Sequence, residues 1–260
     1  MAAWWLLATL WVPMAPGARG LEDPPFISVP CGLTSQSERI IGGSPTSPGR
    51  WPWMGSLQRL RRHSCGATLL NHHWVLTATH CLYPNSGKFS DITLLRLASS
   101  VSFTKYVQPV CVKNTSAEFI NREDCWITGW GWNVSRTLQE AMLSIMNHSW
   151  CDSLYSKPSP HSRDNEFCAG TEDGSRDSCR GDSGGPLVCE DQGHWVQVGV
   201  VSRGEGCAIP NRPGIYVNVS DYFYWIKQVL DSGPGPTALG PALLLPLLCT
   251  VASLPLSLRP

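Results

Sequence analysis

The chain has 260 residues, which is enough for one or two compact units with a sizeable core. Its 20 basic and 20 acidic residues cancel and charged residues make up only 15%, which argues against the basic face of a nucleic-acid-binding protein. The 24 glycines and 21 prolines, without a long amphipathic helical pattern, are typical of a turn-rich β protein.

The chain begins with an apolar stretch that predicts a secretory signal peptide over residues 1–20. Ala2 to Val12 is uncharged, and small residues and two prolines follow it, although a basic segment before the apolar run is absent. An N-terminal membrane anchor is the alternative, and the shortness of the run disfavours it. We therefore expect an extracellular or cell-surface protein.

The cysteines and the glycosylation motifs are also consistent with secretion. Eleven cysteines in a secreted chain imply disulfides with one thiol left over, and spacing alone does not assign the pairs. Four Asn-X-Ser/Thr motifs give weak further support, since each arises often by chance; their asparagines are Asn114, Asn133, Asn147 and Asn218.

Two segments in the first half place chemistry-bearing residues at strand ends. The apolar run Trp74 to Cys81 ends on His80 next to a cysteine, and Asp91 stands at the head of the apolar segment 91–97. Taken singly, His80 is equally consistent with a core histidine, and Asp91 with an acid at the end of a strand. The other six histidines receive no catalytic role.

The most informative run is Asp177-Ser-Cys-Arg-Gly-Asp-Ser-Gly-Gly-Pro186. A serine hydroxyl is a poor nucleophile unless a base takes its proton and donors stabilise the oxyanion that forms. The glycines allow the backbone N–H groups of Gly181 and Ser183 to face one point, as such an oxyanion hole requires. An ordinary Gly-rich turn is the alternative for a shorter fragment of this run.

The C-terminal region divides into a predicted helix over residues 221–230 and a tail over residues 232–260. A Pro/Gly-rich spacer leads to Ala242–Leu258, which has no charged residue. We expect this tail to be a glycolipid-anchor (GPI) signal and not a transmembrane helix, with plain secretion as the third possibility. Cys249, the expected odd cysteine, would leave with the tail.

His80, Asp91 and Ser183, in this order and in these motifs, resemble the catalytic residues of chymotrypsin-fold, trypsin-like (S1) serine proteases, and within them the membrane-anchored testis proteases. The resemblance runs from about Cys31 to Asp231. It implies an all-β fold of two antiparallel Greek-key barrels with a C-terminal helix. It also implies that Ser183 is the nucleophile, that His80 is the general base, and that Asp91 orients the imidazole.

The resemblance further implies activation by cleavage. Ser37 to Gly43 resembles the family's activation site, with cleavage after Arg39 and burial of the new Ile40 ammonium against Asp182. This gives a propeptide over residues 21–39 and a peptidase domain over residues 40–231.

Substrate pocket and disulfides follow from the same resemblance. Asp177 would form the base of a pocket for arginine or lysine, with Ser202, Gly204 and Gly214 around it. The implied disulfides are Cys31–Cys111, Cys65–Cys81, Cys125–Cys189, Cys151–Cys168 and Cys179–Cys207.

The expected partners are protein or peptide substrates, an activating trypsin-like protease, and serpin or Kunitz-type inhibitors. The sequence offers no cluster of His and Cys with metal-ligand spacing, and we expect neither a metal nor another cofactor.

Two departures from the family pattern favour an alternative, a catalytically impaired homologue that acts by binding or has no activity. Only eleven positions separate His80 from Asp91, whereas relatives place roughly forty there, so the first barrel is expected to lack about two strands and Asp91 to lack support. Arg203 stands where relatives have tryptophan. It either folds into the pocket toward Asp177 as a plug or points to solvent.

Overall fold

The computed structural model describes residues 26–27, 30–34, 44–83, 90–131, 135, 137–155 and 165–232. Several predicted features lie outside these ranges: the signal peptide, the activation site at Arg39 and Ile40, the sequon at Asn133 and the C-terminal tail. Within the described residues, no helix is both long enough and apolar enough to cross a membrane.

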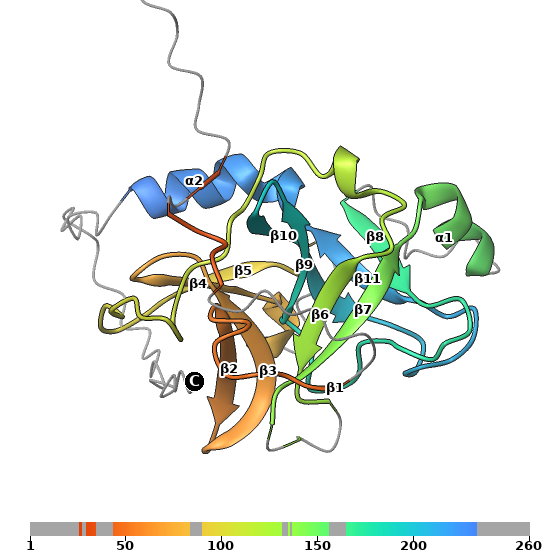
Figure 1. Ribbon diagram of the computed structural model, residues 1–260, viewed down its shortest axis with the longest axis horizontal. Helices are drawn as coiled ribbons and strands as arrows, with labels where there is room; N and C mark the ends of the chain where they lie inside the picture. The colour runs from red at the N-terminus through yellow and green to blue at the C-terminus, as the bar shows by residue number, and fades with distance from the viewer. Residues whose placement is uncertain are drawn as a thin grey trace, which may run out of the picture.

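The described chain forms two antiparallel β units side by side (Figure 1). Its strands are β1 (Ser44–Pro45), β2 (Met54–Arg59), β3 (Arg62–Leu69), β4 (Trp74–Thr77), β5 (Thr93–Arg96), β6 (Cys125–Gly129), β7 (Gln139–Ile145), β8 (Glu166–Gly170), β9 (Pro186–Asp191), β10 (His194–Arg203) and β11 (Gly214–Asn218).

The second unit is a closed barrel of six strands in the order β7-β6-β9-β10-β11-β8. Pairing of Ser144 with Gly170 and of Ile145 with Ala169 joins β7 to β8 and removes both edges. Apolar residues fill the interior, and eight of the ten residues of β10 are buried. This unit confirms the predicted barrel of the second half.

The first unit is an open sheet in the order β2-β3-β4-β5, with β2 and β5 at its two edges. The expectation of an incomplete first barrel is confirmed, because the short connection from His80 to Asp91 carries no strand among its described residues. On β4, Val75 and Leu76 are fully buried, but their partners Leu95 and Leu94 on β5 are only half-buried. The edge strand therefore lacks a neighbour that would cover it.

Packing between the two units compensates for the open sheet. One continuous core cluster contains Trp51 and Trp53 from the first unit together with Trp126 from β6. The ring centroids of Trp51 and Trp126 lie 6.0 Å apart, and those of Trp51 and Trp195 lie 4.9 Å apart. Such aromatic pairs add to the free energy gained from burying apolar area, which holds the sheet against the barrel.

The helices are short, and one of them completes the same core. They are α1 (His148–Leu154) and α2 (Phe223–Asp231), with 3₁₀ turns at Thr79–Cys81, Ala117–Phe119 and Val219–Tyr222. Helix α2 confirms the predicted C-terminal helix and lies over the first unit (Figure 1). Its buried residues Phe223 and Ile226 join the shared core cluster, so the last described element packs against the first unit.

The described residues form five disulfides, and these are the five pairs that the family resemblance implied. Cys31–Cys111 joins the segment at residues 30–34 to the body of the molecule. Cys65–Cys81 joins β3 to the turn that carries His80. Each bridge contributes about 2–4 kcal/mol in simple chain-entropy models, which matters for a fold with one open sheet.

Candidate active site

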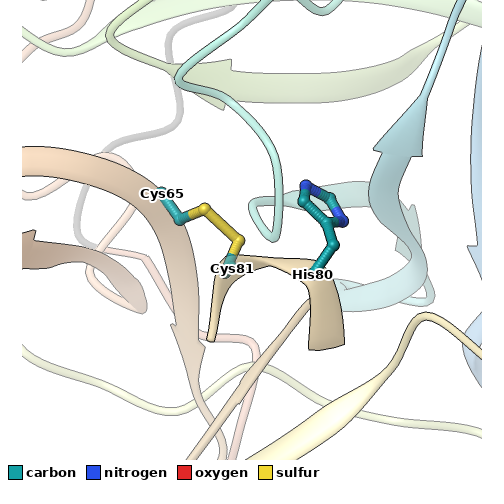
Figure 2. A group of neighbouring side chains, drawn as sticks. All are labelled: Cys65, His80 and Cys81. Atoms are coloured by element: carbon teal, nitrogen blue, oxygen red, sulfur yellow. A yellow bond between two sulfur atoms is a disulfide. The ribbon is translucent and has the colours of Figure 1, made fainter. Parts of the chain in front are cut away.

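His80 lies in a 3₁₀ turn that follows β4 and is fixed on both sides. The Cys65–Cys81 disulfide ties the next residue to β3, and Figure 2 shows it beside the imidazole. On the other side, the Thr79 hydroxyl donates a hydrogen bond of 2.9 Å to the carbonyl of Ile92. Thr79 thus links the turn directly to the segment that carries Asp91, across the short connection.

Asp91 faces His80 and is held from three directions. Its Oδ2 accepts hydrogen bonds from His80 Nδ1 at 2.7 Å and from the Ser202 hydroxyl at 2.6 Å, and its Oδ1 accepts one from the His80 backbone N–H at 2.9 Å. Asp91 is only 4% exposed. The expectation that this carboxylate lacks support is wrong, because Ser202 from the second barrel and the turn around His80 replace the missing scaffold.

These contacts set the charge and the tautomer of the pair. Burial disfavours the charge of Asp91, but the hydrogen bonds from His80 and Ser202 together outweigh it and lower the pKa of this carboxyl below its ordinary value. An ionised carboxylate accepts a hydrogen bond and cannot donate one, so His80 Nδ1 carries a proton. In the neutral imidazole, Nε2 is then the basic nitrogen.

Ser183 lies at the junction of the two units. Its carbonyl accepts a hydrogen bond of 2.8 Å from Gly66 on β3, and the next residue, Gly184, donates one of 2.8 Å to Val201 on β10. Gly184 has φ +78°, and a Cβ there would lie 2.2 Å from Thr77 Oγ1, which excludes a larger residue. Among the described residues no hydrogen bond joins the Ser183 hydroxyl to His80. In unliganded sites this contact often tightens only when substrate binds.

Gly181 has a backbone conformation that only glycine adopts easily. Its φ is +98°, and a Cβ would lie 2.7 Å from the carbonyl oxygen of Gly131. Its carbonyl lies 2.7 Å from Nε2 of His63, whose Nδ1 lies 2.8 Å from the Ser56 hydroxyl. His63 therefore holds the loop that carries Ser183, a role that sequence reasoning missed because no local motif surrounds this histidine.

Asp182 points away from solvent beneath this loop. Its two carboxylate oxygens accept hydrogen bonds from the backbone N–H groups of Gly131 (2.8 Å) and Cys179 (3.0 Å). Burial raises the pKa of Asp182, and these N–H donors offset the rise only in part. A Cβ on Gly129 would lie 1.9 Å from the carboxylate, so glycine is required there. The partner expected from the sequence, Ile40, lies outside the described residues.

Asp177 is half-buried and lies beside Gly214. It accepts hydrogen bonds from the N–H groups of Ser178 (2.7 Å) and Ala208 (3.1 Å). Burial raises its pKa to about 6, although these donors oppose the rise. A Cβ on Gly214 would lie 3.0 Å from Asp177 Oδ1, and one on Gly204 would lie 3.8 Å from the Cα of Gly214. Gly214 therefore lies against the Asp177 carboxylate with Gly204 beside it, whereas Ser202, also predicted for this pocket, donates to Asp91 instead.

Arg203 forms an ion pair with Glu166 that sequence reasoning did not foresee. Its Nη1 donates to Glu166 Oε1 at 2.6 Å, and its Nη2 donates to Oε2. The Glu166 side chain is only 3% exposed. Neither of the two expected arrangements, a plug on Asp177 or a solvent-facing side chain, is observed. The reason lies in the sheet register. Strand β11 lies between β10 and β8, and its residues Ile215 and Val217 pair with Arg203 and Glu166, which brings these two side chains together across β11.

Cys65, His80 and Cys81 are close enough to suggest a metal site, with potential ligand atoms within 4.8 Å of one another. Figure 2 shows why this group does not offer one: both sulfurs belong to a disulfide. Zinc sites use deprotonated thiolates, and a disulfide sulfur is not such a ligand.

The described sequon asparagines differ in accessibility. Asn114 is exposed, whereas Asn218 at the end of β11 is half-buried and accepts a hydrogen bond from Ser220. Asn147 caps the first turn of α1, because its side chain accepts from the Trp150 N–H.

The fold and the site together define a class, and comparison with known proteins agrees. A closed barrel beside a second β unit, with a histidine–aspartate pair and a glycine-rich serine loop at their junction, is the arrangement of chymotrypsin-fold proteases. A family model described as "Trypsin" matches residues 40–89 and 82–226. The chain belongs to the trypsin family of serine proteases, and it is a serine endopeptidase. The two matched segments overlap at residues 82–89, inside the short connection.

Two human proteins are similar over most of their length. Serine protease 41 is 41% identical over 285 residues, which cover 90% of this chain and 88% of the relative. Testisin is 38% identical over 281 residues, which cover 85% of this chain and 88% of the relative.

Proposed function

We propose that this chain is a zymogen that, once cleaved, hydrolyses peptide bonds after arginine or lysine through an acyl-enzyme. The observation that carries the proposal is the contact of His80 Nδ1 with Asp91, kept in spite of the missing strands. The carboxylate of Asp177 among glycines supports the preference for a basic side chain.

The geometry supports the following sequence of steps. His80 Nε2 takes the proton of the Ser183 hydroxyl while Oγ bonds to the carbonyl carbon, and the backbone N–H groups of Gly181 and Ser183 stabilise the resulting oxyanion. The imidazolium, stabilised by Asp91, then gives its proton to the leaving amine as the C–N bond breaks. Water repeats the cycle: His80 takes its proton, the hydroxide displaces Ser183, and the serine regains its hydrogen.

Activation is proposed to work through Asp182. A buried carboxylate with a raised pKa is costly while it is charged and lacks a cation. Cleavage after Arg39 by a trypsin-like protease would supply the ammonium of Ile40, and Cys31–Cys111 would keep the propeptide of residues 21–39 attached to the domain of residues 40–231. Serpin or Kunitz-type proteins are the proposed inhibitors.

Five disulfides support a secretory route, since such bonds persist in oxidising compartments. We propose a signal peptide over residues 1–20, a glycolipid-anchor signal over residues 232–260, and Asn114 as the favoured glycosylation site because it is exposed.

Active-site labelling tests the proposal. The chain is cut after Arg39 and treated with a fluorophosphonate, which labels only an activated serine. We expect label on Ser183 and none in His80→Ala, because Nε2 is then missing. A folded, cleaved chain without label contradicts the proposal and favours the impaired homologue, which the open first sheet independently suggests.

Glu166 offers a second, smaller prediction about the pocket. Glu166→Gln removes the charge that holds Arg203, and the released guanidinium can then turn toward the half-buried carboxylate of Asp177. We expect KM for arginyl substrates to rise about tenfold with little change in kcat, since a contact of this kind is worth about 1–2 kcal/mol. The double variant Glu166→Gln/Arg203→Trp should recover the original KM. Failure of this rescue would show that Glu166 acts only on folding.

A further inference from the structure

The hairpin that joins β2 to β3 ends in an exposed basic tip, residues 59–62. Arg59 pairs with Arg62, and Leu60 and Arg61 form the two-residue turn between them. All four side chains are exposed, and Leu60 is 87% exposed. Three cations and one leucine thus project together into solvent.

The turn adopts a conformation that its residues disfavour. Leu60 has φ +51° and Arg61 has φ +62°. Two-residue turns of this type need positive φ at both positions, which is why Asn-Gly is preferred there. Leucine and arginine meet a steric penalty in this region, and such penalties are concentrated at functional sites. The strained turn is a second feature, independent of charge, that marks this tip as a candidate site.

The charges of the tip have no ion-pair partner among the residues that the structure describes. Within the described ranges, Arg50, Arg122, Arg203 and Arg212 each form an ion pair with a carboxylate, but Arg59, Arg61 and Arg62 form none. Adjacent like charges on one hairpin repel one another, so an anionic partner relieves a cost already present in the molecule.

The tip lies at the start of β3, and the middle of this strand contacts the segments that carry His80 and Ser183. His80 delivers its proton to the leaving amine, so the part of a substrate after the cleaved bond must leave the site next to His80. Cys81 ties this position to Cys65 on β3. Followed back from Cys65, β3 leads to His63, which contacts the carbonyl of Gly181, and then to Arg62 at the tip. The pocket of Asp177 belongs to the other barrel.

We propose that the basic tip of residues 59–62 binds acidic side chains of the substrate on the C-terminal side of the cleaved bond. This inference rests on the proposed endopeptidase function and names a substrate class for it: proteins in which arginine or lysine is followed, a few residues later, by glutamate or aspartate. Leu60 would add an apolar contact between the charged pairs.

Cleavage of matched peptides tests the proposal. Internally quenched peptides share one N-terminal half ending in arginine, and carry three Glu, three Gln or three Lys at the second to fourth positions after it. We expect kcat/KM for the Glu peptide to exceed that for the Gln peptide about tenfold at low salt, since exposed ion pairs are individually weak but three act together. High salt should shrink the ratio.

Variants separate the tip from the catalytic site. Arg59→Gln/Arg61→Gln/Arg62→Gln should bring the ratio of Glu to Gln peptides close to one while cleavage of a short arginyl chromogenic substrate is unchanged. The matched control, Arg96→Gln on the exposed end of β5, should leave the ratio intact. If the triple variant does not fold, the single charge reversal Arg61→Glu serves, and should shift the preference toward the Lys peptide.

Binding to the inactive variant Ser183→Ala distinguishes failure of this inference from failure of the proposed function. Tighter binding of the Glu peptide that depends on the three arginines supports the basic tip even if turnover is absent. Equal binding of the Glu and Gln peptides overturns it. The inference is also overturned if the triple arginine variant loses binding to phosphatidylserine vesicles but keeps the same peptide preference. The tip would then be a membrane contact.

Discussion

Asp91→Asn is expected to lower kcat by about 10⁴-fold, the size known for this exchange in chymotrypsin-fold triads. Asparagine is close to isosteric, but its amide favours the imidazole tautomer with the proton on Nε2, and His80 then cannot accept the serine proton. Both oxygens of Asp91 accept hydrogen bonds, whereas asparagine would present an amide NH₂ group at one of the two positions. Steady-state kinetics on the chain cleaved after Arg39 measure the effect.

Ser202→Ala is the matched control for this prediction. It removes one donor to Asp91 Oδ2 but leaves both contacts with His80, so a loss of no more than about tenfold is expected for one hydrogen bond to a charged group. A thermal melt of each variant checks that the fold is kept. If Asp91→Asn lowers kcat by less than tenfold and leaves the melting temperature unchanged, His80 is oriented without the carboxylate.

Asp177→Ser is expected to lower kcat/KM for arginyl and lysyl substrates by about 10²–10³-fold, because removing one partner of a desolvated charge pair costs about 2–5 kcal/mol. The substitution leaves the glycines at 204 and 214 in place, so cleavage after an uncharged side chain should not fall in parallel. The measurement is the ratio of kcat/KM for arginyl and for apolar substrates. A parallel loss on both would indicate a structural defect and not a specificity residue.

The same carboxylate predicts a pH dependence for binding of cations. Burial raises the pKa of Asp177 to about 6. Above this pH the carboxylate is charged and attracts a cation; below it the group is protonated, and affinity should fall up to about tenfold per pH unit. Benzamidine inhibition constants report this directly, because binding of the inhibitor does not need His80 to act as a base. Asp177→Ser should abolish the dependence near pH 6.

The open first sheet lacks two strands, but its apolar residues are covered by the barrel and by α2. Trp51, Trp53 and Trp126 form a core common to both units, and α2 covers the first unit from the far end of the chain. At the catalytic site, Ser202 of β10 donates to Asp91. Parts of the molecule that come late in the sequence therefore support what the shortened segment no longer supports.

The sequence predicted those features that depend on a few adjacent residues or on the family resemblance. The glycine-rich run around Ser183 predicted a loop that glycine conformations allow, and Gly181 and Gly184 indeed have positive φ. The order of His80, Asp91 and Ser183 pointed to the family, and the disulfide pairs came from that family resemblance and not from local pattern. Backbone conformation is set largely by neighbours along the chain, so such features are readable before folding.

Tertiary structure alone decided which distant side chains meet. Arg203 reaches Glu166 because β11 aligns β10 with β8, His63 reaches Gly181 across 118 positions, and Asp91 receives Ser202 across 111. No local pattern encodes these contacts, since a one-residue change of register would send each side chain to the opposite face of its strand. The sequence therefore determined the family and the groups available for catalysis, and the register of two β units decided how they are supported.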